Sequence, residues 1–174
     1  MSRGSIDDAR VLHELLKLTN RLLAPFSTHL ADRYAISVNE FRVLMMIGNL
    51  GTTASHEITE QTGVNAMTVS RAVAMLEKNG RITVVRDPEN RRRKALRLTA
   101  EGERLYAIML RQTIKVGDYL VSELSVEDVA AFERILSVLI ATLEARDEQG
   151  RSLFLERTRP DDSDEAGDGA RRRR

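Results

Sequence analysis

The sequence contains no cysteine, and this absence removes several kinds of chemistry at once. Disulfide bonds, thiolate nucleophiles, cysteine-ligated zinc and thiol redox sensing are all excluded. Tryptophan is also absent, aromatic residues make up only 4% of the chain, and proline occurs three times. We therefore expect a core of aliphatic side chains and methionine, built from long helices that few prolines interrupt.

Neither charge sign predominates in the chain. Its 174 residues include 27 lysines and arginines against 26 aspartates and glutamates, which leaves a net charge of +1. This balance argues against a protein that binds nucleic acid by bulk charge, although it is compatible with a local basic patch. The sequence also lacks an apolar run of about 18 residues, which a membrane span needs, and a signal-like segment at its start. We expect a cytoplasmic protein with one compact domain, charged tails and no membrane partner.

The N-terminal third has the spacing of helices. Apolar residues at intervals of three and four predict a first helix over residues 10–33. Pro25 lies within this helix and should kink or break it near Ala24. The apolar stripe of this helix is longer than one small domain can readily cover. Ser37 and Glu40 have the spacing of a capping box, which predicts a second helix that ends near residues 48–51.

Two further helices are predicted to follow at the spacing of a helix-turn-helix. Ser55 is expected to cap a short helix over about 55–62, and Gly63 provides the backbone freedom of a tight turn. Asn65 then caps a helix over about 66–79. The alternative is a plain pair of antiparallel helices within a helical core, which the same spacing also permits.

After Gly80 the pattern changes from helix to strand. Residues 81–86 and 94–98 alternate in polarity and flank a turn at 87–90, which predicts a β-hairpin. Six basic and two acidic residues lie between Arg86 and Arg97, which gives this hairpin a net charge of +4. A solvated run of charge is the simple interpretation, but a basic hairpin directly after a recognition helix is typical of a wing that contacts DNA.

The remaining sequence predicts two long helices and a tail. Thr99 can cap a fifth helix, and Ser125 with Asp128 resembles another capping box that opens a sixth. Beyond Gly150 the helical pattern fades, and residues 147–174 are expected to form a charged, mostly disordered tail. The predicted fold is therefore mainly α with one small β-hairpin.

The helix over 66–79 has one apolar and one polar face. Val69, Ala72, Val73 and Leu76 are predicted to pack on the preceding helix. The opposite face and its first turns carry the polar and basic groups that can bind phosphates or base edges in a major groove. With the hairpin, the candidate DNA contacts are Ser55, Asn65, Thr68, Ser70, Arg71, Arg86, Arg91, Arg92, Arg93 and Lys94.

These features together resemble the MarR family of winged helix-turn-helix transcriptional regulators. The matching segments are Val69-Ser70-Arg71, Leu76-Glu77-Lys78-Asn79-Gly80, Asn90-Arg91-Arg92 and Leu98-Thr99-Ala100-Glu101-Gly102. The resemblance covers roughly residues 10–146. It implies a homodimer formed by the first, fifth and sixth helices, in which two winged modules face one pseudo-palindromic double-stranded DNA operator.

The resemblance also implies a division of the chain. Residues 1–9 would be an N-terminal arm and 10–36 a dimerisation helix. Residues 37–99 would form the winged helix-turn-helix lobe, 100–146 the remaining dimerisation helices and 147–174 the tail. Members of the family often bind aromatic acids, phenols or related molecules in a crevice beside the dimer helices. His13, Tyr34 and Arg42 are the candidate effector-binding groups here, against the alternative that each is a surface or interface side chain.

The expected function is that of a ligand-responsive repressor released by a small aromatic acid or its thioester, without a cofactor. Asn90 stands where the family's wing usually carries an aspartate, and the missing cysteine excludes the peroxide-sensing route. An enzyme is not expected, because His56-Glu57 lacks the second histidine of a zinc protease motif. The alternative is a winged-helix module that acts through protein contacts without binding specific DNA.

Overall fold

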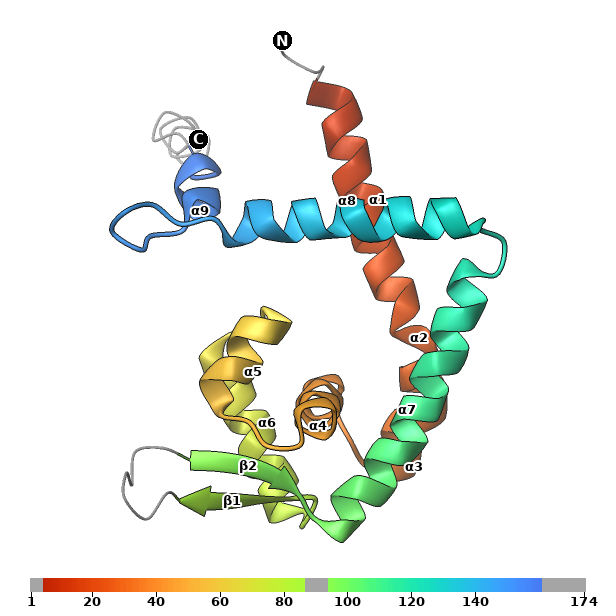
Figure 1. Cartoon of the computed structure of the whole chain (residues 1–174), viewed down its shortest axis with the longest axis vertical. Helices are drawn as coiled ribbons and strands as arrows, with labels where there is room; N and C mark the ends of the chain where they lie inside the picture. Colours follow the sequence, from red (N-terminus) through yellow and green to blue (C-terminus); the bar gives the residue numbers. More distant parts are fainter. Residues whose placement is uncertain (1–4, 87–93, 161–174) are drawn as a thin grey trace, which may run out of the picture. The chain divides into compact units, whose positions relative to one another are not determined.

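The computed structural model of the chain describes residues 5–86 and 94–160 (Figure 1). These residues fall into two compact units, residues 1–120 and 121–174, which are described separately. Helices and one two-stranded antiparallel sheet make up the described parts, so the predicted fold class is confirmed. The first unit carries the helix-turn-helix and the hairpin.

The first unit begins with an interrupted helical segment. It consists of α1 (Ser5–Leu22), α2 (Ala24–Phe26), a π-helix η1 (Ser27–Ala31) and α3 (Asp32–Tyr34). The predicted break before Pro25 is present, because α1 ends at Leu22. The helix starts at Ser5 rather than at residue 10, so the predicted start of the first helix is wrong and residues 5–9 are helical. Ala35, in a left-handed conformation with φ of 44°, ends the segment.

Two capping arrangements define the helices that follow. In α4 (Val38–Leu50), Ser37 accepts a hydrogen bond from the Glu40 backbone at 3.2 Å, and Glu40 accepts one from the Ser37 backbone at 3.0 Å. This confirms the predicted capping box. In α5 (Ser55–Thr62) the cap residue is Ala54, so the prediction that Ser55 caps this helix is wrong. The Glu57 carboxylate takes the backbone N–H of Ala54 at 2.8 Å instead.

The recognition helix α6 (Ala66–Lys78) and the hairpin have the predicted positions. Strands β1 (Ile82–Arg86) and β2 (Lys94–Leu98) pair from Ile82 opposite Leu98 to Arg86 opposite Lys94. The predicted turn at 87–90 lies outside the described residues. A bridge between Thr53 and Leu96, which no local sequence pattern predicts, ties the α4–α5 loop to the hairpin.

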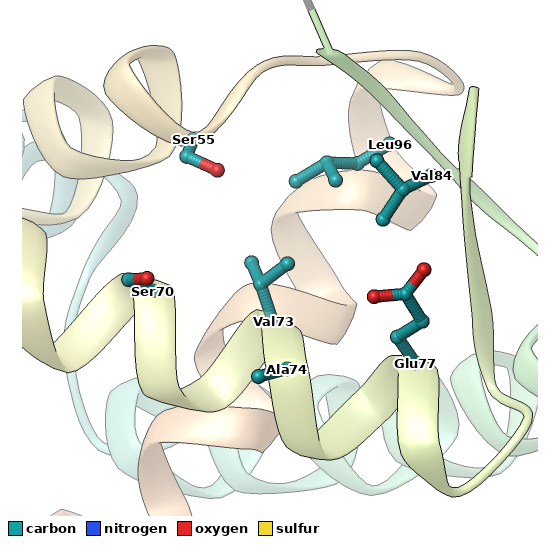
Figure 2. A pocket seen from close by; sticks show the side chains of 7 residues that line it. All are labelled: Ser55, Ser70, Val73, Ala74, Glu77, Val84 and Leu96. Carbon is teal, nitrogen blue, oxygen red and sulfur yellow. The ribbon is translucent and has the colours of Figure 1, made fainter. Parts of the chain in front are cut away.

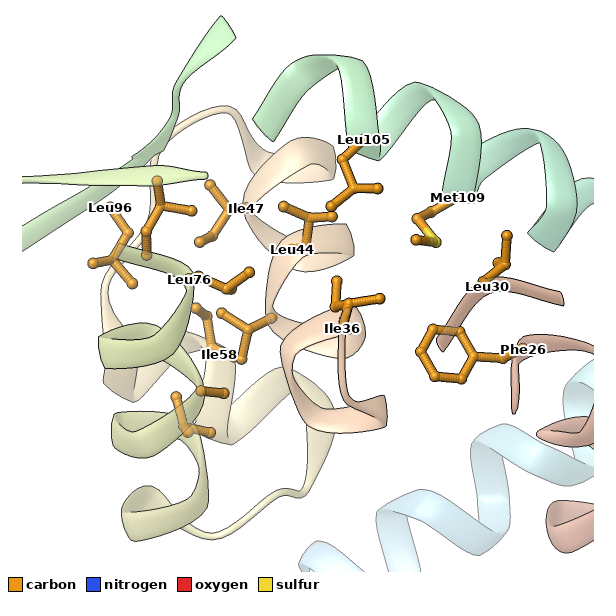
Figure 3. Packing of buried hydrophobic residues seen from close by; sticks show 14 residues of the cluster. Phe26, Leu30, Ile36, Leu44, Ile47, Ile58, Leu76, Leu96, Leu105 and Met109 are labelled. Carbon is orange, nitrogen blue, oxygen red and sulfur yellow. The ribbon is translucent and has the colours of Figure 1, made fainter. Parts of the chain in front are cut away.

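The core of the first unit lies where α4, α5, α6, β2 and α7 (Ala100–Val121) meet (Figure 3). Leu44, Ile47, Ile58, Leu76 and Met109 have no exposed surface. Burial of each such side chain contributes about 1.5–3 kcal/mol, so these contacts hold the lobe together. The expectation of an aliphatic core supplemented by methionine is confirmed.

The C-terminal end of α6 is fixed to two other elements. Thr99 donates a hydrogen bond to the Gly80 carbonyl at 2.7 Å and caps α7 by accepting from the Gly102 backbone at 3.1 Å. The Arg81 guanidinium donates to the carbonyls of Tyr34 and Ala35, which end α3. The C-terminal end of α6 is therefore held by the end of α3 and by the start of α7.

The second unit contains α8 (Val126–Glu144) and α9 (Leu153–Arg157). The predicted capping box at Ser125 is present, since Ser125 and Asp128 exchange hydrogen bonds. The prediction of a disordered tail is wrong for residues 147–160. The Asp147 carboxylate accepts backbone hydrogen bonds from Gln149 at 2.9 Å and Arg151 at 2.8 Å, and α9 follows this turn. The rest of the predicted tail, 161–174, lies outside the described residues.

Candidate nucleic-acid interface

The recognition helix divides into a buried and an exposed face. Val69, Ala72 and Leu76 are buried against α4 and α5, as predicted, whereas Val73, which was predicted to pack with them, is only half-buried. Ser70 and Arg71 are exposed, and Thr68 is half-buried. The helix therefore presents a polar surface that its own fold does not use.

Asn65 has a structural role at the start of this helix. Its Oδ1 accepts a hydrogen bond from the Thr68 backbone at 2.9 Å, which confirms the predicted cap. Gly63, with φ of 65°, makes the turn that brings α5 and α6 together. The cap occupies the side-chain oxygen of Asn65 and leaves its Nδ2 group as a donor for another partner.

A cleft of about 350 Å³ lies between α5, α6 and the hairpin (Figure 2). It is lined by Ser55, Ser70, Val73, Ala74, Glu77, Val84 and Leu96. The structure thus brings together Ser55 and Ser70, two of the candidate DNA contacts, although they come from different helices. Hydroxyl groups in such a position can donate to phosphate oxygens. Glu77, which is not among the predicted site residues, places a carboxylate at the hairpin end of the same cleft.

The basic hairpin is described only in part. Arg86 and Lys94 are paired opposite each other where the two strands adjoin residues 87–93, but their side chains are not described. Arg91, Arg92 and Arg93 lie outside the described residues. The side chain of Arg97 is exposed on β2, and its Nε donates to the Thr52 hydroxyl at 3.1 Å. The net charge of +4 on this hairpin is therefore counted from the sequence, since most of its basic side chains are not among those described.

The three candidate effector residues are in different environments. His13 is exposed on α1. Tyr34 is half-buried in α3, and the guanidinium of Arg33 lies 5.5 Å from the centre of its ring. Arg42 donates to the Asn39 side chain at 3.3 Å. Within the part of the chain that the structure describes, no hydrogen bond or ring contact joins these three residues.

The charged pair at the start of α7 is exposed. Arg104 donates two hydrogen bonds of 2.7 Å to the Glu101 carboxylate, and these bonds lower the pKa of Glu101. Such pairs contribute little to stability because water screens them. Among residues 5–86 and 94–160, no three histidine, aspartate or glutamate side chains are grouped to hold a metal ion. The described helices also include none with the length and apolarity needed to cross a membrane.

Comparison with known proteins agrees with this architecture. Residues 36–94 match the model of the MarR family. An uncharacterized HTH-type transcriptional regulator of Bacillus subtilis, YwoH, is 27% identical over 120 residues, which cover 69% of this chain and 87% of that protein. The segment that matches the family model therefore includes the helix-turn-helix, strand β1 and the first residue of β2.

Solved structures share the fold. BpsR of Bordetella bronchiseptica, whose DNA binding is regulated by 6-hydroxynicotinic acid, has a TM-score of 0.66 and 22% identity, covering 75% of this chain and 98% of BpsR. A mutant MarR of E. coli in complex with operator DNA has a TM-score of 0.62 and 20% identity, covering 75% and 91%. Residues 36–94, which hold most of the winged helix-turn-helix, thus match the MarR family of transcriptional regulators, and these solved structures share the fold of the chain.

Proposed function

We propose that this protein is a homodimeric regulator that binds a pseudo-palindromic DNA operator and is released from it by a small aromatic acid. The exposed polar face of α6, adjoining the cleft that contains Ser55 and Ser70, carries the proposal. Helix α6 enters the major groove with its first turns, where Thr68 and Arg71 lie. Asn65 uses its free Nδ2 donor there, and the two serine hydroxyls bind phosphates.

The hairpin supplies the sequence-independent part of the affinity. Two of its basic residues end the paired strands, and three more lie between them in the sequence: Arg86 and Lys94, and Arg91, Arg92 and Arg93. Basic side chains in such a wing bind phosphates or enter the minor groove, where negative potential is concentrated. A protein of net charge +1 thereby binds DNA through a local patch.

Dimerisation is supported by apolar side chains that the single chain leaves exposed. Leu12 and Leu16 on α1 are 59% and 58% exposed, and Ile140 and Leu143 on α8 are 52% and 51% exposed. Exposed apolar surface of this extent is typical of a protein interface. A second copy of the chain would cover it and set the spacing of two recognition helices.

The proposed effector is an aromatic acid or its thioester, with His13, Tyr34 and Arg42 as candidate contacts. BpsR is regulated by an aromatic acid, and this relationship supports the class of ligand. Release from DNA requires that the ligand bind more tightly to the dimer that does not fit the operator. Repression would then end when the ligand accumulates.

The test is DNA binding by the full chain to the duplex upstream of its own gene, compared with random duplex. Arg71→Ala should reduce discrimination between the two by about 1–3 kcal/mol. Arg92→Ala should weaken binding to both and flatten the dependence on salt. Arg157→Ala, which removes an exposed arginine of α9, is the control and should change neither quantity. Equal affinity of the wild type for both duplexes would favour the alternative of a protein-interaction module.

A further inference from the structure

An apolar side chain lies on the polar face of the recognition helix. Met67 is the second residue of α6 and is 65% exposed. The buried stripe of this helix consists of Val69, Ala72 and Leu76, so Met67 does not serve the core. Met67 therefore offers an apolar contact to a partner surface that has an apolar group at this position.

Arg71 lies one helical turn after Met67 and contacts it. Its Nη2 is 3.5 Å from the Met67 sulfur. This contact directs the guanidinium towards the N-terminal end of α6, which in the proposed docking lies deepest in the major groove. A thioether sulfur is a weak acceptor, so the other guanidinium donors remain available to a stronger partner.

Because Met67 and Arg71 are in contact, they place an apolar and a cationic group side by side, close enough to reach neighbouring base pairs. The sulfur and the guanidinium nitrogen are 3.5 Å apart, and successive base pairs of B-DNA are about 3.4 Å apart. The 5-methyl group of thymine is the apolar group that the major groove displays, and guanine presents the O6 and N7 acceptors that suit arginine. A thymine beside a guanine therefore offers the complement of this pair.

We propose that Met67 and Arg71 form one specificity-determining unit, in which Met67 contacts a thymine methyl group and Arg71 binds the adjacent guanine. Each operator half-site then contains a thymine next to a guanine. The proposal rests on the proposed function, because it requires that α6 enters the major groove. It adds Met67 to the contacts and a dinucleotide to the operator.

The experiment begins with selection of high-affinity sites from a pool of random duplexes by the full-length wild-type protein. In the enriched half-site, each thymine next to a guanine is replaced by deoxyuridine, which lacks only the methyl group. Loss of one buried methyl contact should weaken binding about fourfold per half-site. Replacing the guanine by 7-deazaguanine should weaken binding by the wild type and leave Arg71→Ala unchanged.

Two methionine variants separate the proposed contact from general effects. Met67→Ala should bind thymine and deoxyuridine duplexes equally, because the variant lacks the thioether side chain that contacts the thymine methyl group. Met75→Ala is the matched control, since Met75 is also exposed on α6 but lies two turns further along. It should retain the wild-type preference for thymine. Circular dichroism would verify that both variants keep the helical content of the wild type.

The outcomes distinguish this proposal from the proposed function. If no sequence is enriched, the proposed function fails and this proposal fails with it. If a sequence is enriched but lacks a thymine beside a guanine, or if Met67→Ala still prefers thymine to deoxyuridine, only this proposal is overturned. A preference for thymine that Met67→Ala loses and Met75→Ala keeps would confirm the unit.

Discussion

At the residue scale, the hydrogen-bond partner of a polar side chain determines which role it has. Asn65 was predicted both to cap α6 and to contact DNA, and the structure shows the cap through its Oδ1. Glu57, which stands beside His56 in a superficially zinc-like pair, binds the Ala54 backbone and the Thr53 hydroxyl instead. A carboxylate used in this way stabilises the start of α5.

Replacement of Asn65 should separate its two roles. Asn65→Ala removes the cap and should lower the free energy of unfolding by about 1 kcal/mol. Asn65→Ser restores a cap acceptor, so its stability should lie within a few tenths of a kcal/mol of the wild type. Urea denaturation measures both values. If Nδ2 contacts DNA, both variants should bind the operator more weakly, whereas a purely structural Asn65 would leave the serine variant with wild-type affinity.

Some residue-level features could be predicted from the sequence and others could not. The caps at Ser37, Asn65 and Ser125 follow from short local patterns, and all three are present. The predicted cap at Ser55 was wrong because the helix starts one residue earlier, with Glu57 bound to the Ala54 backbone. The local pattern does not show which of these two starts is preferred. Glu77 was missed because its place in the cleft depends on the hairpin opposite.

At the scale of elements, two glycines of α7 face different surroundings. A Cβ atom at Gly102 would lie 1.9 Å from the Arg81 carbonyl oxygen, whereas nothing lies within 4 Å of one at Gly117. Gly102→Ala should therefore lower the free energy of unfolding by about 1–3 kcal/mol, because a backbone atom cannot rotate away. Gly117→Ala should raise it by about 0.5–1 kcal/mol through helix propensity.

Thermal or chemical denaturation of the two glycine variants provides a matched comparison, since the substitution and the helix are the same. Gly102→Ala should also weaken operator binding, because α7 would move away from the end of the recognition helix. Equal stability changes of the same sign in both variants would contradict the close approach of α7 to Arg81.

The turn before α9 should depend on pH. Hydrogen bonds from Arg151 to the Asp147 carboxylate lower the pKa of Asp147 below its ordinary value of about 3.9. The charged carboxylate is the form that the fold binds, so its stabilisation is complete above that ordinary value. It is lost as the pH falls through the lowered pKa.

Amide chemical shifts of Leu153, Phe154 and Leu155 followed through this pH range would report the loss of α9. Asp147→Asn should give the acid-type spectrum already at neutral pH, and Glu148→Gln is the control in the same turn. A helix α9 that persists in Asp147→Asn would contradict the role assigned to this carboxylate.

The elements with strong local signals were predicted well, and those that depend on tertiary contacts were not. Periodicity and caps located α4 to α8 to within a few residues. The bridge between Thr53 and Leu96 joins residues that are distant in sequence, so no local pattern announces it. The segment over 147–160 has few apolar residues, and this composition predicts disorder. Its order depends on a turn around the Asp147 carboxylate, which composition does not reveal.

At the scale of the whole molecule, the exposed apolar side chains of α8 support the proposed dimer. Leu139→Glu should place a charge in the proposed dimer interface and convert the protein to a monomer at micromolar concentration, as sizing chromatography would show. Ser137→Glu, on the polar side of the same helix, is the control and should remain dimeric. A monomeric wild type at that concentration would contradict the dimer.

The molecule combines a small net charge with locally opposed regions. The wing carries +4, so the rest of the chain carries −3 to reach the net charge of +1. Such a distribution suits specific and reversible binding, because few positive charges oppose the DNA backbone and the remainder does not attract it. The polar face of α6 must then supply the discrimination between sequences.

The specificity ratio of the wild-type protein tests this account most directly. Affinities for its own upstream duplex and for random duplex should be measured over a range of salt concentrations. We predict a ratio of at least about 10³ for the upstream duplex, with both affinities falling as salt rises. A ratio near one at every salt concentration would contradict sequence-specific DNA binding and with it the proposed function.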